Sequence, residues 1–273
     1  MSKGTLYIVS TPIGNLEDIT LRALRILKEA DVIAAEDTRH SIKLLNHYGI
    51  SKPLISYWGE KEKIKAEDTL EMLNAGRSVA LISDAGTPGI SDPGNILIKK
   101  ALDAGIDVVP VPGPTAIITA LSISGLSTSG FVFVGFLPTK LSLRTRMFKK
   151  LSLEERTIVI YEAPHRMVDT ISEMAEIFGE RNGVLVKELT KLFEETYRGT
   201  LGEILTQLEN SKIAGEYVIV IEGRSEGDAI SLVDALTEMR ALMKKGIGRK
   251  EASKKIAGEY GLSRKELYDK SLD

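Results

Sequence analysis

Short apolar runs alternate with helical stretches through the first 120 residues, and this alternation constrains the fold most. The runs are rich in β-branched and aromatic residues, as in Thr5–Ser10, whereas Leu21, Leu24 and Leu27 recur at helical spacing. Strands that alternate with helices form a mainly parallel sheet covered on both faces. We therefore expect an α/β fold. The expected strands are Thr5–Ser10, Val32–Ala35, Leu54–Trp58, Val79–Ser83 and Asp107–Val111, and the expected helices are Asp18–Ala30, a stretch ending near His47, residues 60–75, Asn95–Ala104 and Ile117–Ile123.

The loop after the fourth expected strand has an unusual composition. Residues 81–94 read Leu-Ile-Ser-Asp-Ala-Gly-Thr-Pro-Gly-Ile-Ser-Asp-Pro-Gly. Glycine permits a positive φ and a close approach of backbone to a ligand, and proline holds a loop in one shape. An ordinary strand-to-helix connection needs only one or two turn residues, so this loop favours a binding site.

Two other strand ends, residues 11–15 and 112–116, are also rich in glycine and proline. Ligands of open α/β sheets lie at the carboxyl ends of strands, so neighbouring strands would gather these loops into a pocket made of backbone. The sequence has no G-x-G-x-x-G motif after a strand and no P-loop, which argues against dinucleotide dehydrogenases and P-loop NTPases. A neutral cleft of this kind suits a nucleoside-like ligand without a triphosphate.

The second half begins with a Gly/Ser stretch, Ser122–Gly130, that predicts a linker. A second α/β unit follows, and we expect domains at 1–121 and 122–225 and a helical tail at 226–273. In the tail, two short helices meet at Gly261, as in a helix-turn-helix or a plain packing hairpin. The further expected elements are strands at Phe131–Val134, Thr157–Tyr161, Val184–Lys187 and Tyr217–Glu222, and a helix ending near Phe178.

Composition excludes several kinds of site. The chain has no cysteine, which excludes disulfides, thiolate catalysis and cysteine-based metal centres. Its three histidines, His40, His47 and His165, are scattered, so we expect no metal site. No apolar run reaches membrane-spanning length, and we expect a cytoplasmic protein without a membrane partner.

Positive charge is concentrated in two segments, although the net charge is −2. Residues 240–273 carry ten Lys/Arg against five Asp/Glu. Such segments suit a polyanionic partner such as RNA, and a solvated helix face is the alternative for each. The basic residues of the other segment, 140–150, are Lys140, Arg144, Arg146, Lys149 and Lys150.

Five motifs occur together and in one order, and on them the chain resembles the tetrapyrrole methylase superfamily. The second and fifth motifs are similar to those of the branch that modifies ribosomal RNA. Gly86-Thr87-Pro88 departs from the Gly-Asp-Pro of the corrin and porphyrin branch, so the Thr87 hydroxyl would have to replace that aspartate. The motifs are Ser10-Thr-Pro-Ile-Gly-Asn15-Leu-Glu-Asp18, Ala35-Glu-Asp-Thr-Arg39, Ser83-Asp-Ala-Gly-Thr-Pro-Gly-Ile-Ser-Asp-Pro-Gly94, Pro112-Gly-Pro-Thr-Ala116 and Tyr161-Glu-Ala-Pro-His-Arg166.

The resemblance implies two α/β domains with S-adenosylmethionine bound between them, and a homodimer. It also implies 2′-O-methylation of the ribose of a cytidine in small-subunit (16S) ribosomal RNA, with the small ribosomal subunit as the expected partner. The residues that it places around the cofactor are Pro12, Gly14, Asp84, Ala85, Gly86, Thr87, Ile90, Thr115, Ala116 and Tyr161.

A ribose hydroxyl is a weak nucleophile, so we expect a positioned base. The candidates are Glu162, Glu188, Asp37 and His165. Arg39, Arg166 and Lys187 are candidates for holding phosphates or a developing alkoxide. Structural roles are the alternatives: Asp37 would cap the helix after it, and His165 and Arg166 would pair with Glu162.

Two other functions fit parts of the sequence. A methyltransferase for a corrin or porphyrin precursor would not need the basic tail. A non-catalytic RNA-binding factor would keep the cofactor fold without turning over the cofactor.

Overall fold

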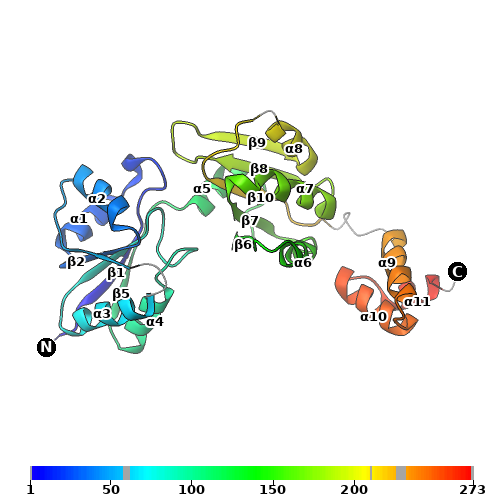
Figure 1. Cartoon of the computed structure of the whole chain (residues 1–273), viewed down its shortest axis with the longest axis horizontal. Helices are drawn as coiled ribbons and strands as arrows, with labels where there is room; N and C mark the ends of the chain where they lie inside the picture. Colours follow the sequence, from blue (N-terminus) through cyan, green and yellow to red (C-terminus); the bar gives the residue numbers. More distant parts are fainter. Residues whose placement is uncertain (1, 58–61, 210, 226–231, 272–273) are drawn as a thin grey trace.

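The computed structural model describes residues 2–57, 62–209, 211–225 and 232–271. Figure 1 shows two sheets with their helices and a separate helical group at the C-terminal end of the chain. The first sheet has the strand order β3-β2-β4-β1-β5, and every neighbouring pair is parallel. Its strands are β1 (Thr5–Val9), β2 (Val32–Ala35), β3 (Leu54–Ser56), β4 (Val79–Ile82) and β5 (Asp107–Val111).

Helices cover both faces of the first sheet because its strand side chains alternate. Leu6 and Ile8 of β1 join the core beneath α3 and α4, whereas Val9 joins the core beneath α1 and α2. This is the parallel, doubly covered sheet that the alternation predicts. The helices are α1 (Leu21–Glu29), α2 (Thr38–His47), α3 (Glu62–Asn74) and α4 (Asn95–Asp103), and a short 3₁₀ turn, η1 (Leu16–Asp18), precedes α1.

Strands β4, β1 and β5 are neighbours, so the three glycine-rich strand ends meet at one edge, as predicted. The N–H of Thr11 donates to the carbonyl of Gly86 over 2.8 Å, and the N–H of Gly86 donates back to Thr11 over 3.1 Å. The first and second of these turns are therefore fixed to each other.

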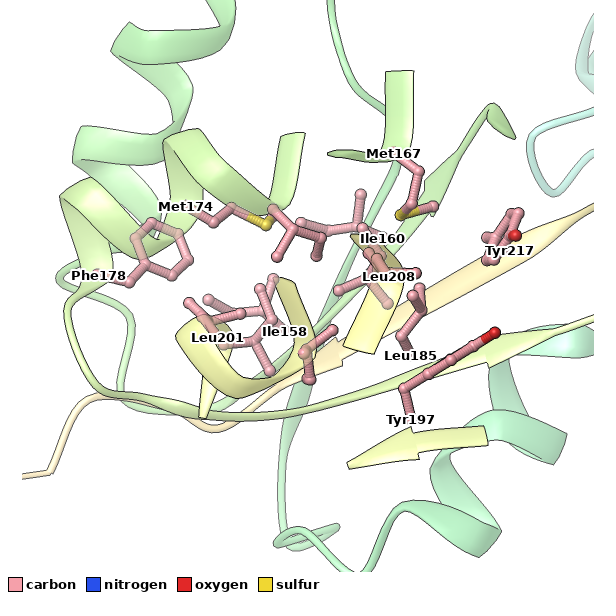
Figure 2. Close-up of a cluster of buried hydrophobic side chains, with 14 of the residues drawn as sticks. Ile158, Ile160, Met167, Met174, Phe178, Leu185, Tyr197, Leu201, Leu208 and Tyr217 are labelled. Atoms are coloured by element: carbon pink, nitrogen blue, oxygen red, sulfur yellow. The ribbon is translucent and has the colours of Figure 1, made fainter. Parts of the chain in front are cut away.

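The second sheet is mixed, in the order β6-β7-β10-β8-β9. Strands β6 and β7 are parallel, and the other neighbouring pairs are antiparallel. One face carries a large apolar core under three helices, which Figure 2 shows from Met174 and Phe178 to Tyr197 and Tyr217. The elements are β6 (Phe131–Phe136), β7 (Thr157–Glu162), β8 (Asn182–Lys187), β9 (Glu195–Thr200), β10 (Tyr217–Ile221), the helices α6 (Leu141–Leu151), α7 (Met167–Phe178) and α8 (Leu201–Glu209), and the 3₁₀ turn η2 (Pro164–Arg166).

Helix α5 (Ala116–Ser124) connects the two halves. It packs on the other face of the second sheet, where Ile117 and Leu121 contact the cluster that contains Val184 and Val218. The expected domain boundary between residues 121 and 122 therefore falls inside this helix, and the expected linker starts with its last turn. Strand β9 and helix α8 were not expected, and Trp58, the predicted end of the third strand, lies outside the described residues.

The C-terminal helices form a small core of their own. They are α9 (Leu232–Lys244), α10 (Arg249–Tyr260) and α11 (Arg264–Lys270). The two helices predicted around Gly261 are α10 and α11, and the Ser263 side chain caps α11 by accepting the N–H of Glu266. Helix α9 was not predicted. Leu153 packs against this core, and Lys149 of α6 lies 3.9 Å from Glu238 of α9. Within the described ranges, no helix combines the length and the apolar character needed to cross a membrane.

Candidate cofactor and active site

A cavity of about 320 Å³ lies between the two sheets, at the edge where the glycine-rich turns meet. This volume falls in the range of small-molecule sites. Of the residues predicted to surround a cofactor, Pro12, Gly14 and Asp84 are not among those that line the cavity. Those that do line it are Ala85, Gly86, Thr87, Ile90, Thr115, Ala116 and Tyr161.

Backbone forms much of the wall on the side of the first sheet. Gly86 has a φ of 76°, a conformation that glycine adopts at low cost. A Cβ placed there would lie 3.6 Å from the Ile13 side chain, which also lines the cavity. At Gly113 a Cβ would come within 2.9 Å of the Ser10 side chain, so the third turn packs closely on the first.

The Thr87 hydroxyl is held in place at the edge of the cavity. It forms a hydrogen bond of 2.8 Å with the hydroxyl of Ser10. That bond ties the second glycine-rich turn to the end of β1, and Thr87 still lines the cavity.

The opposite wall comes from the second sheet and is mostly apolar. Val186, Leu189 and Val218 line it, and they belong to the core beneath α5. Tyr161 stands beside them, and burial, together with the charge of Asp92 across the cavity, raises its pKa to about 12. The phenol is therefore neutral at physiological pH and can both donate and accept a hydrogen bond.

Strained backbone borders the cavity. Within the described part of the chain, the non-glycine residues with positive φ are Ser91, Glu188 and Thr190. Ser91 lines the cavity, and Glu188 and Thr190 flank Leu189, which also lines it. Strain of this kind persists where the surrounding structure enforces it, commonly at functional sites.

The two halves touch through these same loops. The backbone N–H of Asn15 donates to the Thr190 hydroxyl over 3.0 Å. A Cβ at Gly14 would come within 2.5 Å of the Lys191 side chain, so Gly14 serves this close contact although it does not line the cavity.

Glu162 lines the cavity, and its carboxylate is already held by two hydrogen bonds and an ion pair. Its carboxylate accepts the N–H of Ala163 over 2.7 Å and the Thr170 hydroxyl over 2.9 Å, and it lies 3.1 Å from the Arg166 guanidinium. Arg166 also donates to the carbonyls of Leu137 and Pro138. The pair fixes the end of β7 to the end of β6. This is the structural alternative proposed for Arg166, whereas His165 is exposed and outside the pair.

Lys187 ends β8 and Glu188 follows it, and neither residue lines the cavity. Hydrogen bonds from Lys191 and from the N–H of Glu216, each 2.9 Å, outweigh burial and lower the pKa of Glu188. Lys187 is buried and donates to Glu195 over 3.0 Å, which raises its pKa.

Asp37 and Arg39 lie at the start of α2, away from the cavity lining. Asp37 caps the helix by accepting the N–H of Arg39 over 2.8 Å, and the Arg39 side chain bonds the same carboxylate. These bonds hold the pKa of Asp37 at about 2. The capping role is thus present, and the Arg39 side chain is otherwise exposed to solvent.

Asp92 lines the cavity and was not among the predicted site residues. Burial and the negative charge of Glu36 raise its pKa to about 6, with a smaller contribution from Asp84, while a hydrogen bond with Ser83 opposes the shift. Burial likewise raises the pKa of Glu36. Glu36 and Asp84, which do not line the cavity themselves, thus repel the charge of the Asp92 carboxylate, which does.

The cavity is also lined by residues that the sequence did not predict as site residues. Ile13, Ser91, Asp92, Ala163 and Pro164 lie within the five motifs. The others come from the second half outside those motifs and are Phe136, Val186, Leu189, Gly215, Glu216, Tyr217 and Val218.

Comparisons with known proteins agree with this architecture. The model of the Tetrapyrrole (Corrin/Porphyrin) Methylases matches residues 5–205. The Ribosomal RNA small subunit methyltransferase I of Synechocystis sp. is 46% identical over 273 residues, which cover 99% of this chain and 98% of that protein. The protein of the same name from Halalkalibacterium halodurans is 43% identical over 275 residues and covers 98% of this chain and 94% of its own.

Solved structures show the same fold at low identity. One is a uroporphyrin-III C-methyl transferase from Thermus thermophilus complexed with S-adenyl homocysteine, with a TM-score of 0.56 and 22% identity. The superposition covers 80% of this chain and 97% of that one.

Proposed function

This chain belongs to the tetrapyrrole methylase family, and from that premise we propose that it methylates the ribose 2′-hydroxyl of a cytidine in small-subunit (16S) ribosomal RNA. Membership of the family makes it a methyltransferase with S-adenosylmethionine as methyl donor. The observation that carries the RNA substrate is the match to relatives named for small-subunit ribosomal RNA over 99% of the chain, C-terminal helices included.

The cavity has the chemistry that S-adenosylmethionine requires. Apolar side chains such as Leu189 and Val218 offer a surface for an adenine ring, and the Gly86 turn lets backbone come close to a ligand. Asp92 and Glu216 place negative charge at the wall, which suits a ligand with a positively charged sulfur. The residues present therefore fit the donor.

An exposed aromatic side chain at the cavity supports a nucleotide as acceptor. Phe136 lines the cavity and is 60% exposed. Its ring centroid lies 5.6 Å from that of Tyr161, which also contacts Phe133. Unpaired bases commonly stack on such exposed rings, so we assign Phe136 to the cytosine of the target nucleotide.

Exposed cations on the second half and on the tail support contact with an RNA backbone. Lys140, which precedes α6, and Arg146 and Lys150 on α6 are exposed. Arg144 differs from the prediction, because it is buried and bonded to Glu173 over 2.7 Å. The exposed basic residues of α9–α11 are Arg240, Lys244, Lys245, Lys250, Lys254, Lys255, Arg264, Lys265 and Lys270.

We also assign the enzyme to the cytoplasm, as a homodimer that acts on the small ribosomal subunit. Partly exposed apolar side chains on α5 and β6, namely Ile118, Ile123 and Phe131, support a second copy packing there. Light scattering of the purified protein tests the dimer: a monomer at micromolar concentration contradicts it.

The main contribution of the protein to the reaction is to align the acceptor hydroxyl with the methyl group of the donor. S-adenosylmethionine supplies a methyl group already activated by its sulfonium. The chain must hold the ribose hydroxyl in line with that methyl and keep water away, and such positioning can contribute a large share of the rate. Phe136 and the basic surfaces hold the acceptor, and the glycine-rich turns hold the donor.

The test is methyl transfer from radiolabelled S-adenosylmethionine to small ribosomal subunits, naked ribosomal RNA and a porphyrinogen precursor in parallel. Label recovered from RNA in an alkali-resistant dinucleotide is the expected result, because a 2′-O-methyl group blocks cleavage of the following phosphodiester. Label only in the tetrapyrrole contradicts the RNA substrate. No transfer to any acceptor, despite bound donor, favours a non-catalytic binding factor.

A further inference from the structure

Three carboxylates line the cavity, and they differ in their partners. Glu162 lies 3.1 Å from Arg166, and Glu216 lies 2.8 Å from Lys191. Across residues 2–57, 62–209, 211–225 and 232–271, Asp92 forms no salt bridge with any lysine, arginine or histidine. Among the three carboxylates that line the cavity, Asp92 is therefore the one that has no cationic partner in the described residues.

The groups that face Asp92 come from three parts of the chain. Glu36 follows β2, Ser83 and Asp84 follow β4, and Tyr161 lies at the end of β7. Two of these are carboxyls and one is a neutral phenol, so among the described residues only the Ser83 hydroxyl supports the ionised form.

The position of Asp92 in the cavity is also informative. It follows Ile90 and Ser91, which extend the Gly86 turn assigned to the methyl donor. The Ser91 hydroxyl lies 3.3 Å from where a Cβ at Gly135 would be, next to Phe136. Asp92 therefore lies on the loop that runs from the donor turn to the ring assigned to the target base.

We infer that Asp92 is the general base that accepts the proton of the ribose 2′-hydroxyl. In this step the 2′-oxygen forms a bond to the methyl carbon, and the carbon–sulfur bond breaks with its electron pair retained by sulfur. The hydroxyl proton moves to the Asp92 carboxylate and leaves to solvent after the product departs. The inference rests on the proposed function, because it names the base for that reaction.

The other lining carboxylates fit this role less well. Glu162 would have to give up the Thr170 hydroxyl, the Ala163 N–H and Arg166 before it could accept a proton. Glu216 has a side chain that is 74% exposed and bound to Lys191. A base works best when its pKa lies near the operating pH, and the pKa of Asp92, about 6, meets that condition.

Asp92→Asn is the principal test, with Asp103→Asn as the matched control on an exposed residue of α4. We expect the single-turnover rate on ribosomal RNA at saturating donor to fall by about 100-fold or more in Asp92→Asn and to be unchanged in the control. Because the Asp92 charge also suits the cationic donor, calorimetry should show a loss of donor affinity of at most about tenfold in Asp92→Asn, well below the loss of rate, and no loss in the control.

Two further readouts do not depend on whether Asp92→Asn is active. In the ligand-free protein with ¹³C-labelled aspartate carboxyls, a resonance that titrates near pH 6 should be missing from Asp92→Asn. Ser83→Ala removes the hydrogen bond that favours the carboxylate, so it should move the acidic limb of the rate profile to higher pH. A purely structural Asp92 would leave that limb in place.

The outcomes separate this inference from the proposed function. A wild-type rate in Asp92→Asn overturns the base but leaves the RNA substrate intact. Loss of donor affinity in parallel with the rate, restored by excess donor, makes Asp92 a binding residue and also overturns the base. If wild type fails to methylate RNA, the proposed function fails, and the inferred base fails with it.

Discussion

The two walls of the cavity, taken together with the carboxylates next to them, differ in whether negative charge is paired with a cation. On the second sheet, Glu162 is paired with Arg166, and Glu188 with Lys191. On the first sheet, Glu36, Asp84 and Asp92 gather without a salt bridge in the part of the chain that the structure describes. The ion pairs of the paired wall fix strand ends and loops within the second half, whereas the unpaired wall leaves the Asp92 charge for a cationic donor and for proton transfer.

The largest effect should come from filling the glycine turn. Gly86→Val imposes a branched side chain at a φ of 76° and directs it toward Ile13, so we expect donor affinity to fall by about 100-fold or more. Calorimetry measures this directly. Gly49→Val is the matched control, because Gly49 has a φ of 63° with nothing within 4 Å of its Cβ and lies outside the cavity lining. Equal losses of affinity in both variants would contradict the site.

Breaking the paired wall should cost stability. Glu162→Gln leaves the largely buried Arg166 guanidinium without its carboxylate, and we expect the free energy of unfolding to fall by about 3 kcal/mol in urea titrations. Glu154→Gln is the control. It breaks a pair with the more exposed Arg156, which should cost less than about 1 kcal/mol. Similar losses of unfolding free energy in the two variants would show that the Glu162–Arg166 pair stabilises the fold no more than an exposed pair does.

Removing the charge of Asp92 from the unpaired wall should have the opposite effect and raise the free energy of unfolding. The pKa of Asp92 is raised from 3.8 to about 6, so its ionised form opposes folding, fully above about pH 6 and not at all below about pH 4. Asp92→Asn should therefore raise the free energy of unfolding at pH 8 by about 1 kcal/mol, after an allowance for solvent screening. The gain over wild type should shrink as pH falls toward 4. A destabilised variant at pH 8 would contradict this account of the wall.

The smallest effect should come from the outer basic face of the second half. Arg146→Ala removes one exposed cation on α6, and we expect RNA affinity to fall a few-fold and the salt dependence of binding to weaken by about one ion. Arg22→Ala, an exposed cation on α1, should leave RNA binding unchanged. If the two variants bind alike in filter-binding titrations across salt concentrations, the RNA does not contact α6.

The alternation of strands and helices was sufficient to predict the first sheet, in which the central strands β2 and β4 are uninterrupted, buried apolar runs. Strand β9 escaped prediction because it is an edge strand of largely polar residues, from Glu195 to Thr200, with Gly199 inside it. Helix α9 was not predicted, because the helical pattern recognised in the tail covers only the residues around Gly261.

The glycine-rich loops predicted the wall of the cavity on the side of the first sheet. A wall made of backbone requires glycine and proline at particular positions, and these residues can be seen in the sequence. Asp92 lay in the loop, but its lack of a cation depends on which side chains face it in three dimensions. Arg144 was assigned to a basic surface by its charge, yet it lies four residues before the buried Phe148 and therefore on the inner face of α6. Helical spacing alone would have shown this.

A crystal structure with bound S-adenosylmethionine tests the central claim most directly. We predict density for the donor between the Gly86 turn and the apolar wall around Leu189 and Val218, with the Asp92 carboxylate free of the donor's ammonium group and open to the space beside its methyl. Density at another place, or a salt bridge between Asp92 and that ammonium group, would contradict the account.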